Sequence, residues 1–186
     1  MGEIEQLYTL YKLKNVSRRG TVDGTRFEST AEHIYSTLFL ALHFLPKIEQ
    51  QLDESKIIRM ILVHDLVEIY AGDTFILDED HHLTKNDREL HAYEKLKKTL
   101  PQTHESEYLP LWEEFEAQQT LEAKYVKAIE EIDPMMQSIQ RPQEWIKNGF
   151  SEEKLRVKKE KSFKEFPILQ EFFETLIKHL HKTGAI

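Results

Sequence analysis

Hydrophobic and polar residues follow the 3.6-residue period of amphipathic α-helices along most of this chain. The first such segment, residues 4–13, places apolar side chains at Ile4, Leu7, Tyr8 and Leu10. The same period predicts further helices at residues 29–45, 53–68, 85–100, 107–118, 120–132, 151–163 and 167–182. Six glycines and six prolines leave little material for β-turns, and Leu, Glu, Lys, Ile and Ala dominate the composition, so the sequence predicts an all-α fold.

The second predicted helix has a strong start signal. Ser29-Thr30-Ala31-Glu32 is a capping box, in which the hydroxyl of Ser29 and the carboxylate of Glu32 satisfy free N–H groups of the first turn. Glu32 is therefore interpreted as a cap rather than a catalyst. His33 lies in this first turn, and Pro46 ends the helix.

The third predicted helix, capped by Asp53, carries charged groups on its apolar face. Its stripe runs through Ile57, Met60 and Ile61 to His64 and Glu68. Asp65 lies at the edge of the same face. Unpaired charge is costly on a buried face, so either a metal ion or an internal network of ion pairs must compensate it.

Three interruptions separate the helices. Residues 14–25 contain Gly20 and Gly24 and are predicted to form a loop that reaches into a cleft. Residues 72–86 are predicted to form a long acidic loop. Because proline disfavours α geometry at the residue before it, Asp133-Pro134 is expected to end one helix and begin another.

Composition narrows the class of protein. A chain of 186 residues with 40% hydrophobic residues suits a single soluble domain spanning 1–186. The net charge of -8 argues against a nucleic-acid or membrane-surface partner, and the lysines at 154–161 are expected to form a solvated helix face. The start lacks a signal sequence, and the longest apolar stretch, 34–45, is too short to span a bilayer, so a cytoplasmic protein is expected.

The absence of cysteine limits the chemistry. It excludes disulfides and thiolate catalysis, and it leaves only nitrogen and oxygen ligands for a metal. The aromatic residues Trp112 and Phe115 are interpreted as core, and His81 and His82 as solvated loop or lid residues. The remaining histidines have no partner at ligand spacing.

Several motifs occur in a familiar order. They are Glu28-Ser29-Thr30-Ala31-Glu32-His33, then His64-Asp65-Leu66-Val67-Glu68 with Gly72-Asp73, then Trp112-Glu113-Glu114-Phe115-Glu116, and finally Asp133. In order and spacing the chain resembles the HD-domain metal-dependent phosphohydrolases, and within them the 5'-deoxynucleotidase group. The chain departs from that pattern at Pro134, where lysine is common, and after Arg18, where an aromatic residue is common.

The resemblance implies a compact orthogonal helical bundle with a metal site between helices. It implies that His33, His64, Asp65 and Asp133 hold one divalent ion, which could be Mn, Co, Fe, Ni, Zn or Mg. It further implies that Glu68 is a general base or proton shuttle, with a supporting role toward His64 as the alternative. Asp73 would bind a sugar hydroxyl or orient water, and Arg18 would grip the phosphate.

The function implied by the resemblance is hydrolysis of nucleoside 5'-monophosphates, with deoxyribonucleotides as the expected substrates. Two alternatives stay open: an HD-domain hydrolase of another phosphate ester or pyrophosphate, and a non-catalytic helical binding domain stabilised by its metal. The family likeness also suggests a homodimer.

Overall fold

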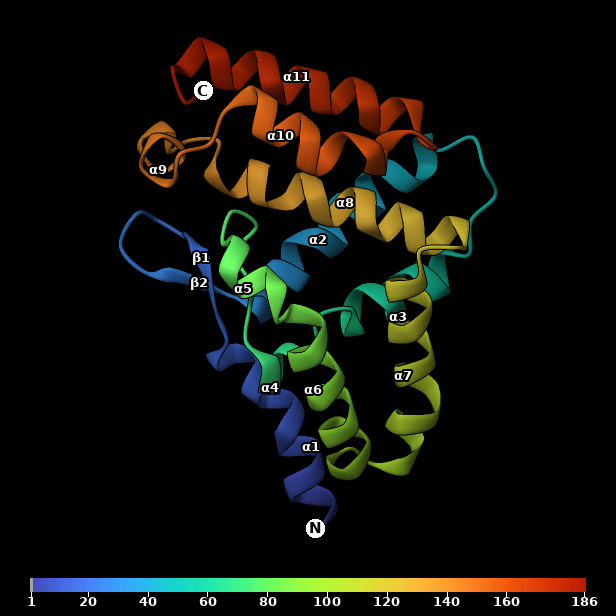
Figure 1. Ribbon diagram of the computed structural model, residues 1–186. Coiled ribbons are helices and arrows are strands. Elements are labelled where there is room, and N and C mark those ends of the chain that lie inside the picture. Colours follow the sequence, from blue (N-terminus) through green and yellow to red (C-terminus); the bar gives the residue numbers. More distant parts are fainter. Residues whose placement is uncertain (1) are drawn as a thin grey trace.

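The computed structural model describes residues 2–186, and helices dominate it (Figure 1). The α-helices are α1 (Glu3–Tyr11), α2 (Thr30–Phe44), α3 (Glu54–Val63), α4 (Glu68–Ala71), α5 (Glu79–Leu83), α6 (Lys85–Thr99), α7 (Gln102–Ala117), α8 (Leu121–Ser138), α9 (Pro142–Asn148), α10 (Glu152–Lys159) and α11 (Pro167–Thr183). Short 3-10 helices lie at Lys12–Asn15, Leu45–Lys47 and Glu160–Phe163. The predicted all-α fold is confirmed, with one small addition: β1 (Ser17–Thr21) pairs antiparallel with β2 (Phe27–Ser29).

Helix α8 is the centre of the bundle. In Figure 1, α8, α10 and α11 run roughly parallel at the top, while α1, α6 and α7 descend steeply below them. Helices α2, α3, α7 and α11 and strand β1 all contact α8. The two groups of helices therefore cross at a large angle, which is the expected orthogonal arrangement, and the hairpin lies at one edge of the crossing.

The main hydrophobic core follows α8. Val126, Ile129 and Met135 on this helix are fully buried, and Phe173 and Leu180 of α11 belong to the same cluster. A smaller core lies between α4, α6 and α7. Across residues 2–186, we find no helix with both the length and the apolar character needed to cross a membrane.

The start of α2 follows the sequence signal. The Ser29 hydroxyl accepts a hydrogen bond from the Glu32 N–H at 3.3 Å, and the Glu32 carboxylate accepts one from the Ser29 N–H at 3.0 Å. Arg26 donates to both carboxylate oxygens of Glu32. The capping box is confirmed, and it fixes the first turn of α2, where His33 lies.

The predicted continuous helix from Asp53 to Glu68 is wrong. The Asp53 carboxylate caps α3 as expected, but α3 ends at Val63 and α4 begins at Glu68. In the turn between them the N–H groups of Leu66 and Glu68 bond to carbonyls three residues earlier. An ideal helix rotates neighbouring side chains by about 100°. The tighter turn instead brings the side chains of His64 and Asp65 together, with Nε2 of His64 3.3 Å from Oδ2 of Asp65.

The segment 14–25, predicted to be a loop, folds into most of a hairpin. Gly24 adopts a φ of +86°, and the Asp23 carboxylate accepts hydrogen bonds from the N–H groups of Thr25 and Arg26. Asp-Gly between extended residues is a recognised hairpin signal that the helical period obscured.

The hairpin is anchored on the C-terminal half of the chain. The Thr21 hydroxyl bonds to Glu144 of α9, and the Gln137 amide of α8 donates to the Thr21 carbonyl at 3.0 Å. Arg141 donates to the Val22 carbonyl at 3.1 Å. These contacts hold β1 at the end of α8.

Helix boundaries explain the other differences. The predicted loop at 72–86 contains α5, which Asp78 caps, and only residues 72–78 and 84 lack helix. Helix α9 was not predicted, although Pro142 at its first position and Gly149 after it are ordinary start and stop signals. Helix α7 begins at Gln102, before the predicted 107.

The expected helix end at Asp133 is also wrong. Pro134 lies inside α8, which continues to Ser138. Proline removes one backbone hydrogen bond from a helix, but burial of both flanking turns in the core favours continuation here.

Candidate metal centre

The predicted site residues gather around one cleft from six separate segments. Arg18 lies on β1, His33 on α2, His64 and Asp65 in the turn after α3, Glu68 at the start of α4, Asp73 after Gly72, and Asp133 on α8. The cleft has a volume of about 370 Å³, within the usual range for a small-molecule site. His64, Asp65, Glu68, Asp73 and Arg18 line it. His33 and Asp133 are buried to 0% and 1% exposure.

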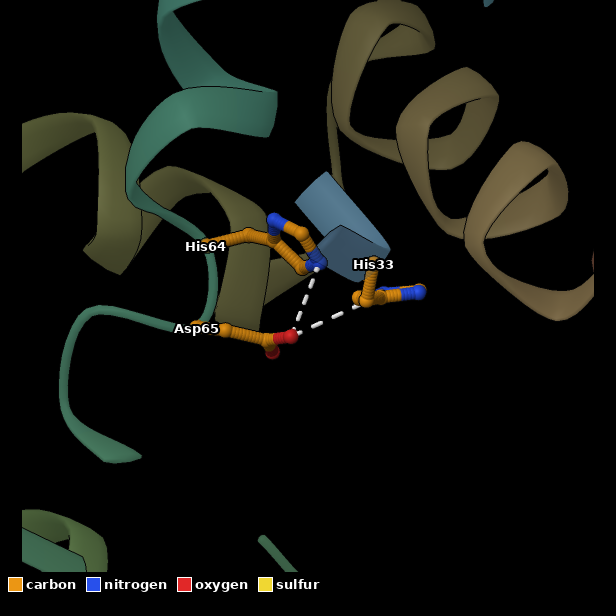
Figure 2. A group of neighbouring side chains, drawn as sticks. All are labelled: His33, His64 and Asp65. Atoms are coloured by element: carbon orange, nitrogen blue, oxygen red, sulfur yellow. Dashed lines mark ion pairs between the residues drawn. The ribbon is translucent and has the colours of Figure 1, made fainter. Parts of the chain in front are cut away.

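Three of the four predicted metal ligands meet at one point. Nε2 of His64 lies 3.3 Å from Oδ2 of Asp65, and Nε2 of His33 lies 3.6 Å from the same oxygen (Figure 2). The centroids of the two imidazole rings are 5.5 Å apart. One donor atom of each residue lies within 4.8 Å of the others, so a single cation can be shared.

The two imidazoles direct their Nε2 atoms at this point. The Nδ1–H of His64 donates to the Ile61 carbonyl at 2.7 Å, and the Nδ1–H of His33 to the Asp133 carboxylate at 2.7 Å. A hydrogen bond at Nδ1 leaves the lone pair on Nε2. Both Nε2 atoms are buried and, within the described residues 2–186, have no hydrogen-bond partner. Such orphaned acceptors beside a carboxylate fit a divalent metal ion with nitrogen and oxygen ligands.

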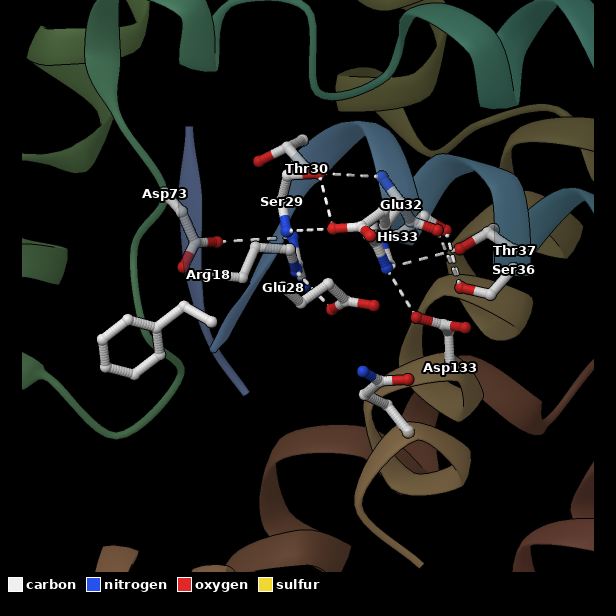
Figure 3. Close-up of polar contacts among 12 residues, drawn as sticks. Arg18, Glu28, Ser29, Thr30, Glu32, His33, Ser36, Thr37, Asp73 and Asp133 are labelled. Carbon is white, nitrogen blue, oxygen red and sulfur yellow. Dashed lines mark hydrogen bonds and ion pairs between the residues drawn. The ribbon is translucent and has the colours of Figure 1, made fainter. Parts of the chain in front are cut away.

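Asp133 does not join the other three predicted ligands. Its Oδ2 contacts the Nδ1 side of the His33 ring, opposite the Nε2 that faces Asp65 (Figure 3). The Thr37 hydroxyl lies 3.4 Å from the same Nδ1. With Glu28 and His33, Asp133 forms a second group of donor atoms within 4.8 Å. In this geometry Asp133 orients His33.

Glu68 lies beside the cluster without contacting its imidazoles. Its Oε2 accepts a hydrogen bond from the Thr30 hydroxyl at 2.8 Å, and its residue exposure is 8%. Burial and the nearby Asp65 carboxylate raise the pKa of Glu68 well above its usual value, although Arg18 opposes them. Burial therefore favours the protonated form of Glu68 relative to an exposed glutamate.

Arg18 is the cation of the site. Its guanidinium lies 3.3 Å from Asp73, 3.4 Å from Asp65 and 3.6 Å from Glu28. Burial alone would lower its pKa, but the carboxylates of Asp65 and Asp73 outweigh this and raise it. Burial raises the pKa of Asp73, against the opposing effect of Arg18. The predicted residues Arg18 and Asp73 thus form an ion pair next to Asp65, and Figure 3 shows the contact between Arg18 and Asp73.

Glu28 is a site residue to which the sequence analysis gave no role. Its exposure is 4%, and burial, followed by the charge of Asp133, raises its pKa to about 7. Its place on β2, across the hairpin from Arg18, could have revealed it only if residues 14–25 had been recognised as a strand.

The residues expected to play no part in the metal site mostly behave as predicted. Phe115 and Trp112 pack in the two cores, which confirms their interpretation, and the Phe115 ring also lies 5.3 Å from that of His64. His81 is exposed. His82 is half-buried and lines the cleft, which contradicts a solvated loop residue but not the lid alternative, and it is in neither donor group found among residues 2–186.

A second buried cluster of charges lies along α8 and α10. Lys159 is 3% exposed and donates to the Glu131 carboxylate at 2.5 Å, and Lys127 lies 3.2 Å from Glu131 and 3.1 Å from Glu130. Burial raises the pKa of each glutamate, but the lysines outweigh it and lower both values to about 2. The expected solvated lysine face is therefore wrong at Lys159.

The orthogonal helices, with a histidine, a His-Asp pair and a buried aspartate on separate segments, define an HD-type metal-binding domain. A model of the HD domain family matches residues 10–170, and the chain belongs to this family.

Similar proteins give this family a narrower setting. The chain is 33% identical over 129 residues to the 5'-deoxynucleotidase HDDC2 of Bos taurus, covering 68% of this chain and 62% of that protein. It is 28% identical over 142 residues to the 5'-deoxynucleotidase YGK1 of Saccharomyces cerevisiae, covering 72% and 63%. The match thus spans less than two thirds of the length of these relatives.

Solved structures share the fold over nearly the whole chain. The crystal structure of a predicted metal-dependent phosphohydrolase from Magnetospirillum magnetotacticum superimposes with a TM-score of 0.84, at 28% identity, covering 98% of this chain and 93% of that one. A conserved hypothetical protein from Pyrococcus furiosus gives 0.63 at 27% identity, covering 94% and 99%.

Proposed function

We propose that this protein is a metal-dependent phosphohydrolase that converts nucleoside 5'-monophosphates, with deoxyribonucleotides as its preferred substrates, to nucleoside and phosphate. The observation that carries the proposal is the pair of buried Nε2 atoms of His33 and His64 directed at one carboxylate oxygen of Asp65. The similarity to 5'-deoxynucleotidases supports the substrate class.

His33, His64 and Asp65 would hold one divalent ion, and the mixed imidazole and carboxylate donors suit Mn, Co, Fe, Ni or Zn, with Mg as a further candidate. A divalent ion bound there would offset phosphate charge and supply a nucleophilic water at neutral pH. Asp133 stays a predicted fourth ligand, but its contact with Nδ1 supports a positioning role for it. Metal content in Asp133→Asn separates the two: a ligand is needed for binding, whereas loss of an orienting group weakens affinity by about 10- to 100-fold.

Glu68 is proposed to hold and pass the proton that hydrolysis requires. The Thr30 hydroxyl fixes its carboxyl group beside the cluster, and burial raises its pKa, which suits a group that takes up and releases a proton. In the alternative role, Glu68 would support His64. Among the hydrogen bonds and ion pairs of residues 2–186, however, the side chains of Glu68 and His64 make no contact with each other.

Arg18 is proposed to bind the phosphate. Its contacts with Asp65, Asp73 and Glu28 are all 3.3 Å or longer, so the guanidinium can turn toward a phosphate without breaking a short bond. Asp73 would then be free to accept a hydrogen bond from a sugar hydroxyl. When Arg18 turns from Asp73 to the phosphate, its positive charge offsets the repulsion between the acidic site and the anionic substrate.

The test is a substrate panel combined with metal analysis. Purified protein is assayed against deoxy- and ribonucleoside monophosphates, other phosphate esters and pyrophosphate, with Mn, Co and Mg in turn, and bound metal is measured by mass spectrometry. We expect about one ion per chain and turnover of monophosphates. Turnover confined to other esters would favour the broader hydrolase alternative, and bound metal without any turnover would favour the binding domain.

Three further predictions concern the whole protein. We propose that residues 1–186 form one domain, that the protein is cytoplasmic, and that it forms a homodimer. Exposed apolar side chains on α1, including Ile4, Tyr8 and Tyr11, support the dimer because exposed apolar surface is typical of interfaces. Light scattering of the purified protein checks the mass in solution.

A further inference from the structure

Three aromatic residues form part of the lining of the cleft. The ring centroids of Phe75 and Phe150 lie 5.9 Å apart with the planes at 86°, and Trp145 lies 4.7 Å from Phe150. All three residues line the same cleft as His64 and Asp65. The cleft therefore joins a charged region to an apolar one.

Short connections along the chain tie the two regions together. Phe75 follows Asp73 by two residues, and Arg19 follows Arg18 directly. The guanidinium carbon of Arg19 lies 5.1 Å from the centroid of the Phe75 ring. A molecule whose charged end meets Arg18 and Asp65 thus has aromatic surface within reach of its other end.

The three aromatic residues differ in how much of each side chain packs in a hydrophobic core. Trp145 is 3% exposed and its indole N–H donates to the Ser138 carbonyl at 3.1 Å, so it forms the back of the cleft. Phe150 is half-buried and packs partly against the main core. Phe75 is half-buried but belongs to neither core cluster among residues 2–186. Its ring borders the cleft without a packing role in either core.

We propose that Phe75 and Phe150 form a subsite for the nucleobase of the substrate; this inference rests on the proposed function. The Arg19 guanidinium lies over one face of the Phe75 ring and borders the subsite there. Because the two rings are nearly perpendicular, a base stacked on one ring meets the edge of the other, and both geometries are favourable for aromatic groups. Stacking accepts every base, since each has a π-face. The subsite therefore selects nucleotides over simple phosphate esters and discriminates weakly among bases.

The experiment compares two substrates that differ only in the base. A deoxynucleoside 5'-monophosphate and deoxyribose 5-phosphate are assayed with Phe75→Leu, Phe150→Leu and, as a matched control, Phe39→Leu, whose ring is 60% exposed on α2. Leucine keeps apolar bulk but removes the π-face. Stacking on an aromatic side chain is worth about 1–3 kcal/mol per base, so kcat/KM for the nucleotide should fall about tenfold, mainly through KM.

The sugar phosphate shows whether the effect comes from the base. We expect its kcat/KM to be unchanged in both cleft variants, and both substrates to be unchanged in Phe39→Leu. Equal losses on the two substrates, or no loss on the nucleotide, would overturn the subsite. Phe75→Leu decides the matter if Phe150→Leu does not fold, because Phe75 lies outside both cores.

Failure of the proposed function gives a separate result. If the unmodified protein hydrolyses neither substrate, the hydrolase proposal fails, and calorimetric binding of the same two compounds then tests the subsite alone. Tighter binding of the nucleotide than of the sugar phosphate, weakened about tenfold in Phe75→Leu, would support it. The subsite would be ruled out if the unmodified protein bound the nucleotide and the sugar phosphate equally. It would also be ruled out if Phe75→Leu bound the nucleotide as tightly as the unmodified protein.

Discussion

Two clusters of charged side chains border α8, one around Glu131 and one around Asp65. In the first the lysines compensate the carboxylates, and in the second the carboxylates are in excess. Around Glu131, each carboxylate has a lysine within about 3 Å, and the pKa values of Glu130 and Glu131 fall to about 2. Around Asp65, the carboxylates outnumber the one arginine, and the pKa values of Glu28, Glu68 and Asp73 rise.

The two clusters differ in the source of the compensating charge, although Lys127, Glu131 and Lys159 line the same cleft as Asp65. Burial penalises charge in both clusters, but only the first supplies the compensating cations from its own side chains. The second leaves two imidazole nitrogens without partners among residues 2–186, and burial raises the pKa values of its carboxyl groups. A cluster left unbalanced by the folded chain is suited to receive a cation and a substrate.

The largest expected effect is from removing a ligand of the unbalanced cluster. In Asp65→Ala or His64→Ala the shared position of the cation is lost, so bound metal should disappear and kcat/KM should fall by roughly 10⁴-fold, as expected when a catalytic ion is removed. Metal content and kinetics are measured on the same samples. Retention of the ion in both variants would exclude this site.

The balanced cluster should respond in stability instead. Lys159→Met removes the nearest cation of Glu131 and leaves Lys127 at 3.2 Å, so the free energy of unfolding should fall by about 1–3 kcal/mol. Urea denaturation gives the value. The double variant Lys159→Met with Glu131→Leu should recover most of the loss, because both charges are then gone; no recovery would mean that the pair is not the source.

Glu68→Gln tests proton transfer within the unbalanced cluster. Glutamine keeps the size of the side chain and an oxygen for the Thr30 hydroxyl, so metal should be retained while kcat falls by about 10²-fold. Thr30→Val is the matched variant that frees the carboxyl group without removing it, and a smaller loss is expected. Turnover equal to that of the unmodified protein in Glu68→Gln would reduce the residue to a supporting role.

The smallest effect is a pair of opposite pH slopes in stability. The folded pKa of Glu131, about 2, is below its ordinary value of 4.5, so its contribution is present above about pH 4.5 and is lost as pH falls through 2. The folded pKa of Glu28, about 7, is above 4.5, so its contribution is present below about pH 4.5 and is lost as pH rises through 7.

Thermal unfolding of metal-free protein between pH 2 and 8 measures both slopes. Glu131→Gln should flatten the acid side and Glu28→Gln the neutral side. Identical profiles for the three proteins would contradict the contrast between the clusters.

The sequence predicted the helical fold and the residues of the site better than the geometry between them. Periodicity located most helices, and the capping box located His33. Periodicity could not show the turn after Val63, because a stripe ending in His64 and Glu68 also suits a regular helix. Motif order placed Asp133 in the site, but the side of the His33 ring that it contacts depends on the packing of α8 against α2.

The anchored hairpin has a consequence for how readily the site opens. Strand β1 carries Arg18, but Gln137, Arg141 and Glu144 hold its far end. Local opening of the hairpin therefore requires those bonds to break, so its amide hydrogens should exchange no faster than the α8–α9 junction permits. The rigidity of the strand that carries Arg18 is thus set more than one hundred positions away along the chain.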